Sequence, residues 1–149
     1  MCEQRNDGGL RIPFFHDDEK AVVDAEFQLS DTYSGAPTLV HGGAQLAVLD
    51  EAMAWATIAI GGQWAFTAKS SAVFGSPVHV DVAHRVVAKV TSQEGDRIAT
   101  VGRIETLDSD VCTESVGELV VLRAARALRI VGEPTDAHHE GFLRSPAGE

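Results

Sequence analysis

Hydrophobic and polar residues alternate from residue 23 to residue 30, and this period of two predicts a half-buried strand. Four longer strand-like runs follow, at residues 64–74, 78–91, 97–107 and 111–122. Short turn signals such as Gly75-Ser76-Pro77 and Asp108-Ser109-Asp110 separate them. Because consecutive strands joined by short turns pair antiparallel, the pattern predicts a meander of about five strands.

The stretch from residue 44 to residue 60 departs from this pattern. It is rich in Ala, Leu, Met, Gln and Glu, and it ends at Gly61-Gly62, so it predicts a helix of about 17 residues, or about 25 Å. Apolar side chains point in nearly every direction, since its only strongly polar residues are Gln45, Asp50, Glu51 and Thr57. A helix of this kind is buried, so we expect the sheet to curl around it.

The length of 149 residues predicts one domain, which we place at residues 1–131. Residues 31–40 contain Gly35 and Pro37 and predict a loop. Residues 123–131 either extend the last strand or form a short basic helix. The polar segment 132–149, with two prolines and three glycines, predicts a flexible tail.

A long helix wrapped by a single sheet leaves a sheet edge and part of the helix uncovered. Pairing of this edge between two copies would cover both, so we expect a homodimer. The sequence leaves open whether two dimers pair into a tetramer.

Charge narrows the range of partners. Twelve Lys and Arg residues stand against 22 Asp and Glu residues, giving a formal net charge of −10, which disfavours nucleic acid and anionic membranes as partners. The N-terminus lacks an apolar signal core, and the longest apolar run is interrupted by Asp50 and Glu51. The two cysteines have neither disulfide nor metal spacing, so we expect a cytoplasmic protein.

Asp50 and Glu51 are unexpected in so apolar a helix. Burying an unpaired carboxylate costs several kcal/mol, so an inward-facing acid needs a dedicated partner. The two side chains point about 100° apart, which lets one lie inward while the other reaches solvent or another subunit. The alternative is that both are edge charges on a water-exposed stripe.

His41-Gly42-Gly43 precedes the helix, where unpaired backbone N–H groups and the helix dipole favour an anion such as the oxyanion of an attacked carbonyl. The alternative is a tight turn. Gly42 and Asp50 are about 12 Å apart along a helix, whereas an oxyanion donor and a base must both lie within about 3 to 4 Å of the reacting group. We therefore expect Gly42 of one chain to act with Asp50 of another.

The segment GAPTLVHGGAQLAVLDEAMAWA, followed by FTAKSSAVFGSPV, resembles the hotdog-fold acyl-CoA thioesterases of the phenylacetate-pathway type. The resemblance runs from about residue 20 to 122 and rests on His-Gly-Gly, an Asp nine residues after the histidine, and a downstream Thr and Pro. It implies an α+β hotdog fold, with an antiparallel sheet of five to six strands wrapped around one long central helix. The implied reaction is hydrolysis of an acyl-CoA or aryl-CoA thioester to free acid and CoA.

The resemblance also implies roles for individual residues. Asp50 matches the catalytic carboxylate, acting as nucleophile or general base, and Gly42 matches the backbone donor that polarises the carbonyl. His41 binds the carbonyl or fixes the loop, and Thr67 holds the attacking water or the carboxylate. Gly43 is expected to contact substrate through its exposed backbone.

Trp55, five residues after Asp50, is either a core or interface residue or part of the acyl pocket. A thioester carbonyl is electrophilic enough for an N–H dipole and a positioned water to act on it, so we expect neither a metal nor a cofactor.

Two positions depart from the family pattern. Several relatives carry Asn, Asp or Gln at the position of Gly35, as a second carbonyl ligand. Lys69 stands where many relatives have an acidic or Asn side chain; strand alternation places it on the same side as Thr67, where it either pairs with Asp50 or Glu51 or reaches solvent. Two other functions stay open, non-catalytic binding of acyl-CoA and hydration of an enoyl-CoA.

Overall fold

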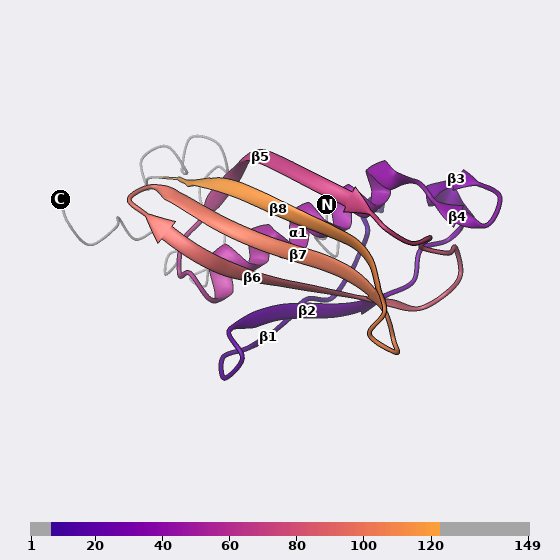
Figure 1. Ribbon diagram of the computed structural model, residues 1–149, viewed down its shortest axis with the longest axis horizontal. Helices are drawn as coiled ribbons and strands as arrows, with labels where there is room; N and C mark the ends of the chain where they lie inside the picture. The colour runs from indigo at the N-terminus through magenta and orange to yellow at the C-terminus, as the bar shows by residue number, and fades with distance from the viewer. Residues whose placement is uncertain (1–6, 123–149) are drawn as a thin grey trace.

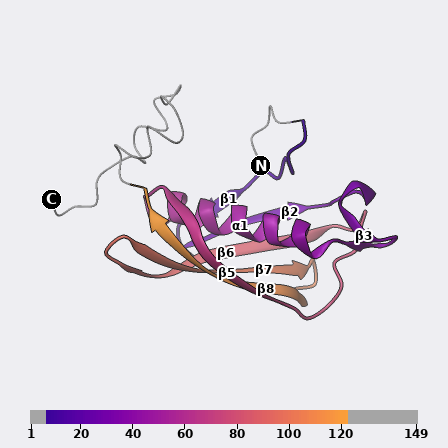
Figure 2. The same ribbon diagram turned by 90° about the horizontal axis from the view of Figure 1, so that it is seen from above.

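The computed structural model of the protein describes residues 7–122. One helix, α1 (Gly42–Ala59), lies along one face of a six-stranded antiparallel sheet (Figures 1 and 2). The strands follow the spatial order β1 (Phe15–Asp17), β2 (Val22–Phe27), β6 (His84–Glu94), β7 (Arg97–Thr106), β8 (Val111–Val121) and β5 (Ala65–Phe74). This arrangement confirms the predicted α+β hotdog architecture.

A small second sheet lies beyond the N-terminal end of α1 (Figure 1). It contains β3 (Ser34–Ala36) and β4 (Leu39–Val40), and the 3₁₀ helix η1 (Asp31–Tyr33) precedes it. The sequence predicted only a loop here, because strands of two and three residues are too short to show a period. The backbone N–H of His41 donates to the carbonyl of Tyr33 at 2.8 Å, which ties the start of α1 to this segment.

The helix is buried because small residues let it approach the sheet closely. Leu49 and Met53 on α1 are fully buried, and they lie over Gly102 of β7 and Gly117 of β8. A methyl group added at Gly117 would lie 2.8 Å from Oγ1 of Thr100 and 3.1 Å from Sδ of Met53. These two glycines therefore set the distance between the helix and the sheet.

Replacing Gly117 with alanine is expected to lower the free energy of unfolding by about 1–3 kcal/mol, the usual cost of overpacking a dense core. Urea unfolding monitored by circular dichroism measures this change. Gly75→Ala is the matched control, because its added methyl would meet only the Cys112 carbonyl at 3.6 Å. Equal stability of the two variants would contradict this account of helix packing.

The predicted meander is correct for β6, β7 and β8 but wrong for β5, which pairs with β8 at the far edge of the sheet instead of with β6. The error came from the start of the next strand, predicted at Val78. Residues 78–80 belong instead to a connection that runs beside β4: the Val40 N–H donates to the Val78 carbonyl, and the Val80 N–H donates to the Thr38 carbonyl. This connection gives the chain the length it needs to cross to the far side of the sheet.

Strand β5 contains a bulge. Thr67 pairs with Leu119 and Lys69 with Glu118, so Ala68 is an extra residue in the ladder with β8. Before the bulge Thr67 faces the helix, and after it the even-numbered residues from Ser70 to Phe74 do so. The bulge therefore lets an odd-numbered residue before it and even-numbered residues after it lie on the same face of the sheet.

The outer face of the sheet carries ion pairs. Arg85 donates to Asp24 through Nε and Nη2, at 3.0 and 2.6 Å, and Arg103 donates to the buried carboxylate of Glu105 at 2.7 Å. The hydrogen bond to Asp24 raises the pKa of Arg85 above its usual value. On the face away from α1, Arg85 thus neutralises an acid of the neighbouring strand β2, and Arg103 neutralises an acid of its own strand, β7.

Some predictions fall outside the described residues. Residues 123–131 and the tail predicted at 132–149 are among them, so the single domain over residues 1–131 stays a prediction. Within residues 7–122, no helix combines the length and the apolar character needed to cross a bilayer.

Candidate active site

The N-terminus of α1 is capped by His41. Its Nδ1 accepts a hydrogen bond from the Gly43 N–H at 2.9 Å, and its carbonyl accepts from the Ala44 N–H at 2.9 Å. Among the described residues, none accepts a hydrogen bond from the Gly42 N–H. The Gly42 N–H is therefore the donor at this helix end that an outside acceptor can use.

The cap also defines the chemistry of the His41 ring. An imidazole nitrogen that accepts a hydrogen bond carries no proton, so a neutral His41 carries its proton on Nε2. The side chain is exposed, and within residues 7–122 it has no further hydrogen-bond partner. His41 can thus offer an N–H donor close to the Gly42 N–H.

Asp50 lies two turns further along α1 and faces β5. The Thr67 hydroxyl donates to Oδ1 of Asp50 at 2.6 Å, which fixes the carboxylate and leaves Oδ2 for another partner. Asp50 is exposed in the single chain, so of the two alternatives for this acid an edge charge describes it better than an inward one. The structure thus brings two of the predicted site residues, Asp50 and Thr67, into direct contact.

A groove of about 510 Å³ runs between α1 and β5, along the edge of the sheet. Asp50 and Gly43 both line it, and the other lining residues are Leu46, Ala47, Ser70, Ala72 and Phe74. The Phe74 ring lies against Gly42, where an added methyl group would be 3.3 Å from its Cε1 atom. The groove therefore has a carboxylate at one end and the capped helix N-terminus at the other.

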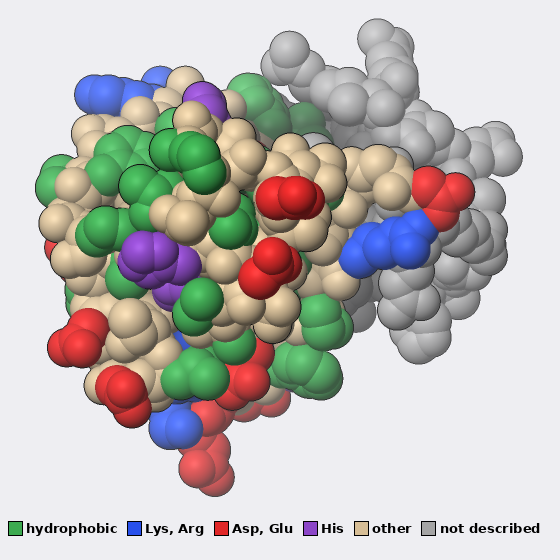
Figure 3. Space-filling model, turned by 90° about the vertical axis from the view of Figure 1, so that its right-hand side faces the viewer, with side chains coloured by type: hydrophobic (Ala, Val, Ile, Leu, Met, Phe, Trp, Pro, Cys, Tyr) green, Lys and Arg blue, Asp and Glu red, His purple; other side chains and the backbone are tan. Residues whose placement is uncertain are grey.

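The end of the molecule that carries the β3–β4 hairpin is seen in Figure 3, where histidine side chains lie among hydrophobic ones. His41 and His79 are exposed, and Phe74 has 50% of its surface exposed. Such a surface combines apolar area with hydrogen-bonding groups, which suits a ligand with an apolar body and a polar centre.

Gln45 holds the N-terminal turn of the helix in place. Its side chain is buried, with Nε2 donating to the Val40 carbonyl at 3.0 Å and Oε1 accepting from the Thr113 hydroxyl at 2.5 Å. The helix is thereby tied to both β4 and β8. The donors at its N-terminus consequently have fixed positions relative to the sheet.

The structure agrees with the argument from helical rise. Gly42 and Asp50 both lie on α1, eight residues or about 12 Å apart along its axis. A single chain thus offers a donor and a carboxylate on one surface, but too far apart to act on one carbonyl group.

Lys69 does not lie on the same side as Thr67, so that prediction was wrong. The bulge at Ala68 reverses the alternation, and Lys69 is exposed on the outer face, across from Glu118 of β8. Within residues 7–122 it forms no ion pair with Asp50 or Glu51. Of the two alternatives, Lys69 reaching solvent is the correct one.

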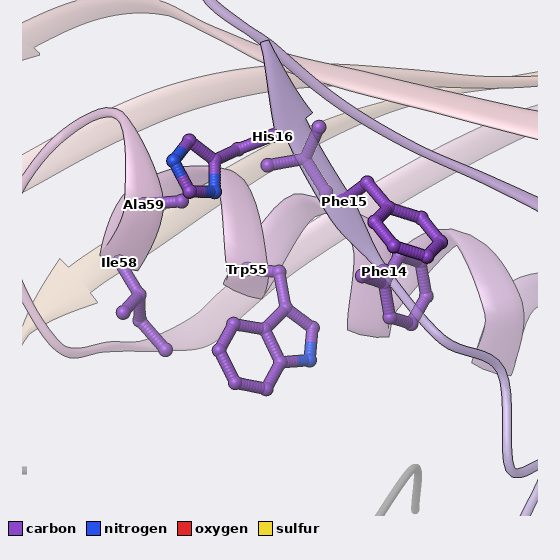
Figure 4. Close-up of a pocket in the computed structure, with 7 residues that line it drawn as sticks. Phe14, Phe15, His16, Trp55, Ile58 and Ala59 are labelled. Carbon is purple, nitrogen blue, oxygen red and sulfur yellow. The ribbon is translucent and has the colours of Figure 1, made fainter. Parts of the chain in front are cut away.

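Trp55 lies apart from the groove that contains Asp50. It borders a second, apolar groove of about 330 Å³, whose other lining residues are Phe14, Phe15, His16, Val23, Ile58 and Ala59. In Figure 4 the indole ring lies between Ile58 and the two phenylalanines. The structure thus brings Trp55 together with the N-terminal segment and not with Asp50 or Gly42.

Sequence reasoning missed Phe74 and Ser70 as lining residues of the groove with Asp50. Regular alternation from Thr67 puts them on the opposite face, and no residue near Ala68 marks a bulge. It also missed Phe14 and Phe15, although the run IPFF at residues 12–15 is a visible apolar signal in an otherwise polar N-terminal segment.

Comparison with known proteins places these features in a family. A family model described as the thioesterase superfamily matches residues 38–113, a little over half of the chain. No curated protein sequence matches. A crystal structure of a thioesterase superfamily protein is 32% identical, with a TM-score of 0.64 over 68% of this chain and 49% of that one, so the match spans about half of that relative's length.

Two further structures resemble the chain in fold. The PaaI protein of E. coli, from the phenylacetic acid degradation operon, is 17% identical, with a TM-score of 0.68 over 76% of this chain and 80% of that chain. A Streptococcus mutans protein bound to acetyl CoA is 13% identical, with a TM-score of 0.70 over 82% and 95%. The family match, the helix in its sheet and the shared fold lead to one conclusion: this chain belongs to the thioesterase superfamily.

Proposed function

We propose that the protein hydrolyses an acyl-CoA or aryl-CoA thioester to the free acid and CoA. The observation that carries the proposal is the hydrogen bond from Thr67 to Asp50, in a groove that also contains the N-terminus of α1. A carboxylate held by one oxygen, with the other left for a second partner, suits attack on an electrophilic carbonyl. The bound acetyl CoA of the Streptococcus mutans protein supports the choice of CoA.

In this proposal Asp50 acts in one of two ways. As a general base, it removes a proton from water while the water oxygen bonds to the thioester carbon. As a nucleophile, its own oxygen bonds to that carbon, and water later hydrolyses the anhydride. In both cases the carbonyl oxygen becomes an oxyanion, the carbon–sulfur bond breaks, and the CoA sulfur leaves and takes up a proton.

The Gly42 N–H stabilises the oxyanion, and the Nε2–H of His41 is a second donor. A backbone N–H at a helix N-terminus combines a hydrogen bond with the positive end of the helix dipole. Gly43 lines the groove beside these donors, so its backbone is placed to contact the substrate in this proposal.

Two chains build each site in this proposal. The two edges of the sheet differ: β1 has three residues, two of them ionisable, whereas β5 has ten residues and one charged side chain, Lys69. A long, nearly uncharged edge suits pairing with another strand, and Val73 and Phe74 on β5 are 70% and 50% exposed. We therefore assign the dimer contact to β5.

The bulge supports this assignment. Thr67 and Phe74 lie towards opposite ends of β5, seven positions apart, and only the extra residue Ala68 lets both face the helix. Antiparallel pairing of two β5 strands centred near Ser71 brings Thr67 of one chain close to Phe74 of the other. Asp50 then faces the Gly42 N–H of the partner chain.

The direct test is a hydrolysis screen of the full-length protein over short-chain, long-chain and aryl-CoA thioesters, with CoA release as the readout. Turnover of at least one class supports the proposal. Tight binding of a thioester without release of CoA would instead identify a non-catalytic acyl-CoA-binding protein, and hydration of an enoyl-CoA would replace the assigned reaction.

Replacing Thr67 with valine is expected to lower kcat about tenfold or more while KM changes little, because the isosteric side chain cannot donate to Asp50. Thr67→Ser is the matched control: it keeps the hydroxyl and should retain most of the activity. Steady-state kinetics of both variants on one active thioester measures the difference. Equal kcat for Val and Ser would remove Thr67 from the site.

A further inference from the structure

The imidazole ring of His41 lies between two glycines. On one side, a methyl group added at Gly35 would be 3.0 Å from Cδ2 of His41 and 3.1 Å from its Cα. On the other side, a methyl group added at Gly43 would be 3.0 Å from Nδ1 and 3.3 Å from Cε1. The two glycines therefore lie on either side of the ring, and Nε2 is the ring atom between Cδ2 and Cε1.

We propose that Gly35 is a positioning residue for His41, whose missing side chain leaves the space that holds the imidazole with Nδ1 on the Gly43 N–H and Nε2–H available to a ligand carbonyl. The catalytic meaning of this inference rests on the proposed function. Its structural content, the orientation and tautomer of the ring, does not.

The contact at Gly35 cannot be relieved by turning the His41 side chain alone, because one of the close atoms is the backbone Cα. The surrounding backbone is also constrained. The His41 N–H donates to the Tyr33 carbonyl at 2.8 Å, two residues before Gly35, and Val40 donates to Val78 at 2.8 Å. A side chain at position 35 must therefore shift either the β3–β4 hairpin or the cap of α1 by a few tenths of an ångström.

The requirement for glycine comes from this contact and not from backbone conformation. Gly35 has no positive φ, so its backbone is open to alanine. Alanine at such a position usually stabilises a protein slightly, by restricting the unfolded chain. An adverse effect of Gly35→Ala on the ring consequently reports on the contact with His41.

The position of Gly35 explains how one donor pair is arranged. The Nε2–H of His41 and the N–H of Gly42 belong to adjacent residues at one helix end, and the position of Nε2 depends on the orientation of the ring. If the ring turns, Nδ1 loses its hydrogen bond from the Gly43 N–H, and Nε2 changes position as well. Gly35 thus acts on the ligand through His41, without touching the ligand itself.

The experiment compares Gly35→Ala with Gly75→Ala, the same substitution at a glycine whose added methyl has ordinary contacts. Imidazole ¹⁵N NMR of the full-length protein, at a pH where the ring is neutral, gives the tautomer, and His41→Asn assigns the signals. We expect Nε2–H in the wild type and in Gly75→Ala. In Gly35→Ala we expect the ¹⁵N shifts of Nδ1 and Nε2 to move towards each other, as they do when the two tautomers mix. We also expect kcat to fall about tenfold with KM nearly unchanged.

An Nδ1–H tautomer in the wild type would overturn the proposal, and so would a Gly35→Ala protein with wild-type shifts and wild-type kcat. If Gly35→Ala does not fold, the wild-type tautomer decides between the two outcomes. If no thioester is hydrolysed but the imidazole shifts respond as expected, the positioning role stands and the proposed function fails.

Discussion

Replacing Asp50 with asparagine is expected to lower kcat for thioester hydrolysis by roughly 10³-fold or more, because an amide is neither a base nor a nucleophile at this position. The fold should survive, since Asp50 is exposed and its partner, the Thr67 hydroxyl, can donate equally well to an amide oxygen. CoA release measured with a thiol reagent gives the rate, and size-exclusion chromatography with light scattering gives the oligomeric state.

Glu51→Gln is the matched control for Asp50→Asn. It removes a neighbouring carboxylate from the same helix, about 100° around its axis, and should retain wild-type kcat. Activity that survives in Asp50→Asn, or that disappears equally in both variants, would contradict the assignment of Asp50 as the catalytic carboxylate.

Replacing Gly42 with proline is expected to lower kcat by about 10²–10³-fold, the usual cost of losing one oxyanion donor. Proline removes the N–H, and it adds a side-chain ring whose Cβ would lie 3.3 Å from the Phe74 ring. Gly42 is the first residue of α1, where proline is favoured, and His41 has ψ 137°, which suits the residue before a proline. Because the Gly42 N–H has no acceptor among residues 7–122, the substitution breaks no hydrogen bond of the described chain.

Gly42→Ala separates the donor from the space around it. Alanine adds the same carbon atom, 3.3 Å from the Phe74 ring, but it keeps the N–H. We expect it to retain most of the activity that Gly42→Pro loses, as measured by kcat on the same thioester. A similar loss in both variants would trace the effect to Phe74 and leave the donor unassigned.

The two inactive variants also test whether each site is built from two chains. A mixed dimer of Asp50→Asn and Gly42→Pro has one site with both substitutions and one site with neither. After random exchange of subunits, the mixture should regain about a quarter of wild-type activity. No gain on mixing, with exchange shown by differently tagged chains, would mean that Gly42 and Asp50 do not act across a dimer contact.

Much of the fold could be predicted from the sequence because its main signals are local. The apolar segment at residues 44–60 predicts a buried helix, and glycines at each end mark its limits; the structure starts it two residues earlier, at Gly42. The strands β7 and β8 follow the predicted runs closely. Each of these signals depends on residues a few positions apart.

Non-local features could not be predicted in the same way. The order of β5 in the sheet depends on a connection, residues 75–83, whose hydrogen bonds go to residues far away in the sequence, among them Val40 and Cys112. The face of the sheet on which Lys69 lies depends on the bulge at Ala68, and no residue type near Ala68 indicates a bulge. In both cases the deciding partner is distant in sequence.

The same division applies to the candidate site. His41, Gly42 and Gly43 share one turn of chain, so their grouping follows from the sequence alone. The contact between Asp50 and Thr67 joins two residues that lie 17 positions apart on different elements, and a family resemblance was needed to suggest it. The position of Phe74 in the groove could not be predicted from the sequence, because the bulge at Ala68 decides on which face of the sheet Phe74 lies.

The bulge at Ala68 affects how this protein can change over evolutionary time. Exchanging one side chain on β5 alters a single point of the groove wall. Gaining or losing one residue between Ser70 and Phe74 would instead exchange inward and outward positions along that segment and shift Phe74 from Gly42. Substitutions along β5 are therefore tolerated more readily than insertions or deletions, and we expect the number of residues from Thr67 to Phe74 to stay constant as the sequence evolves.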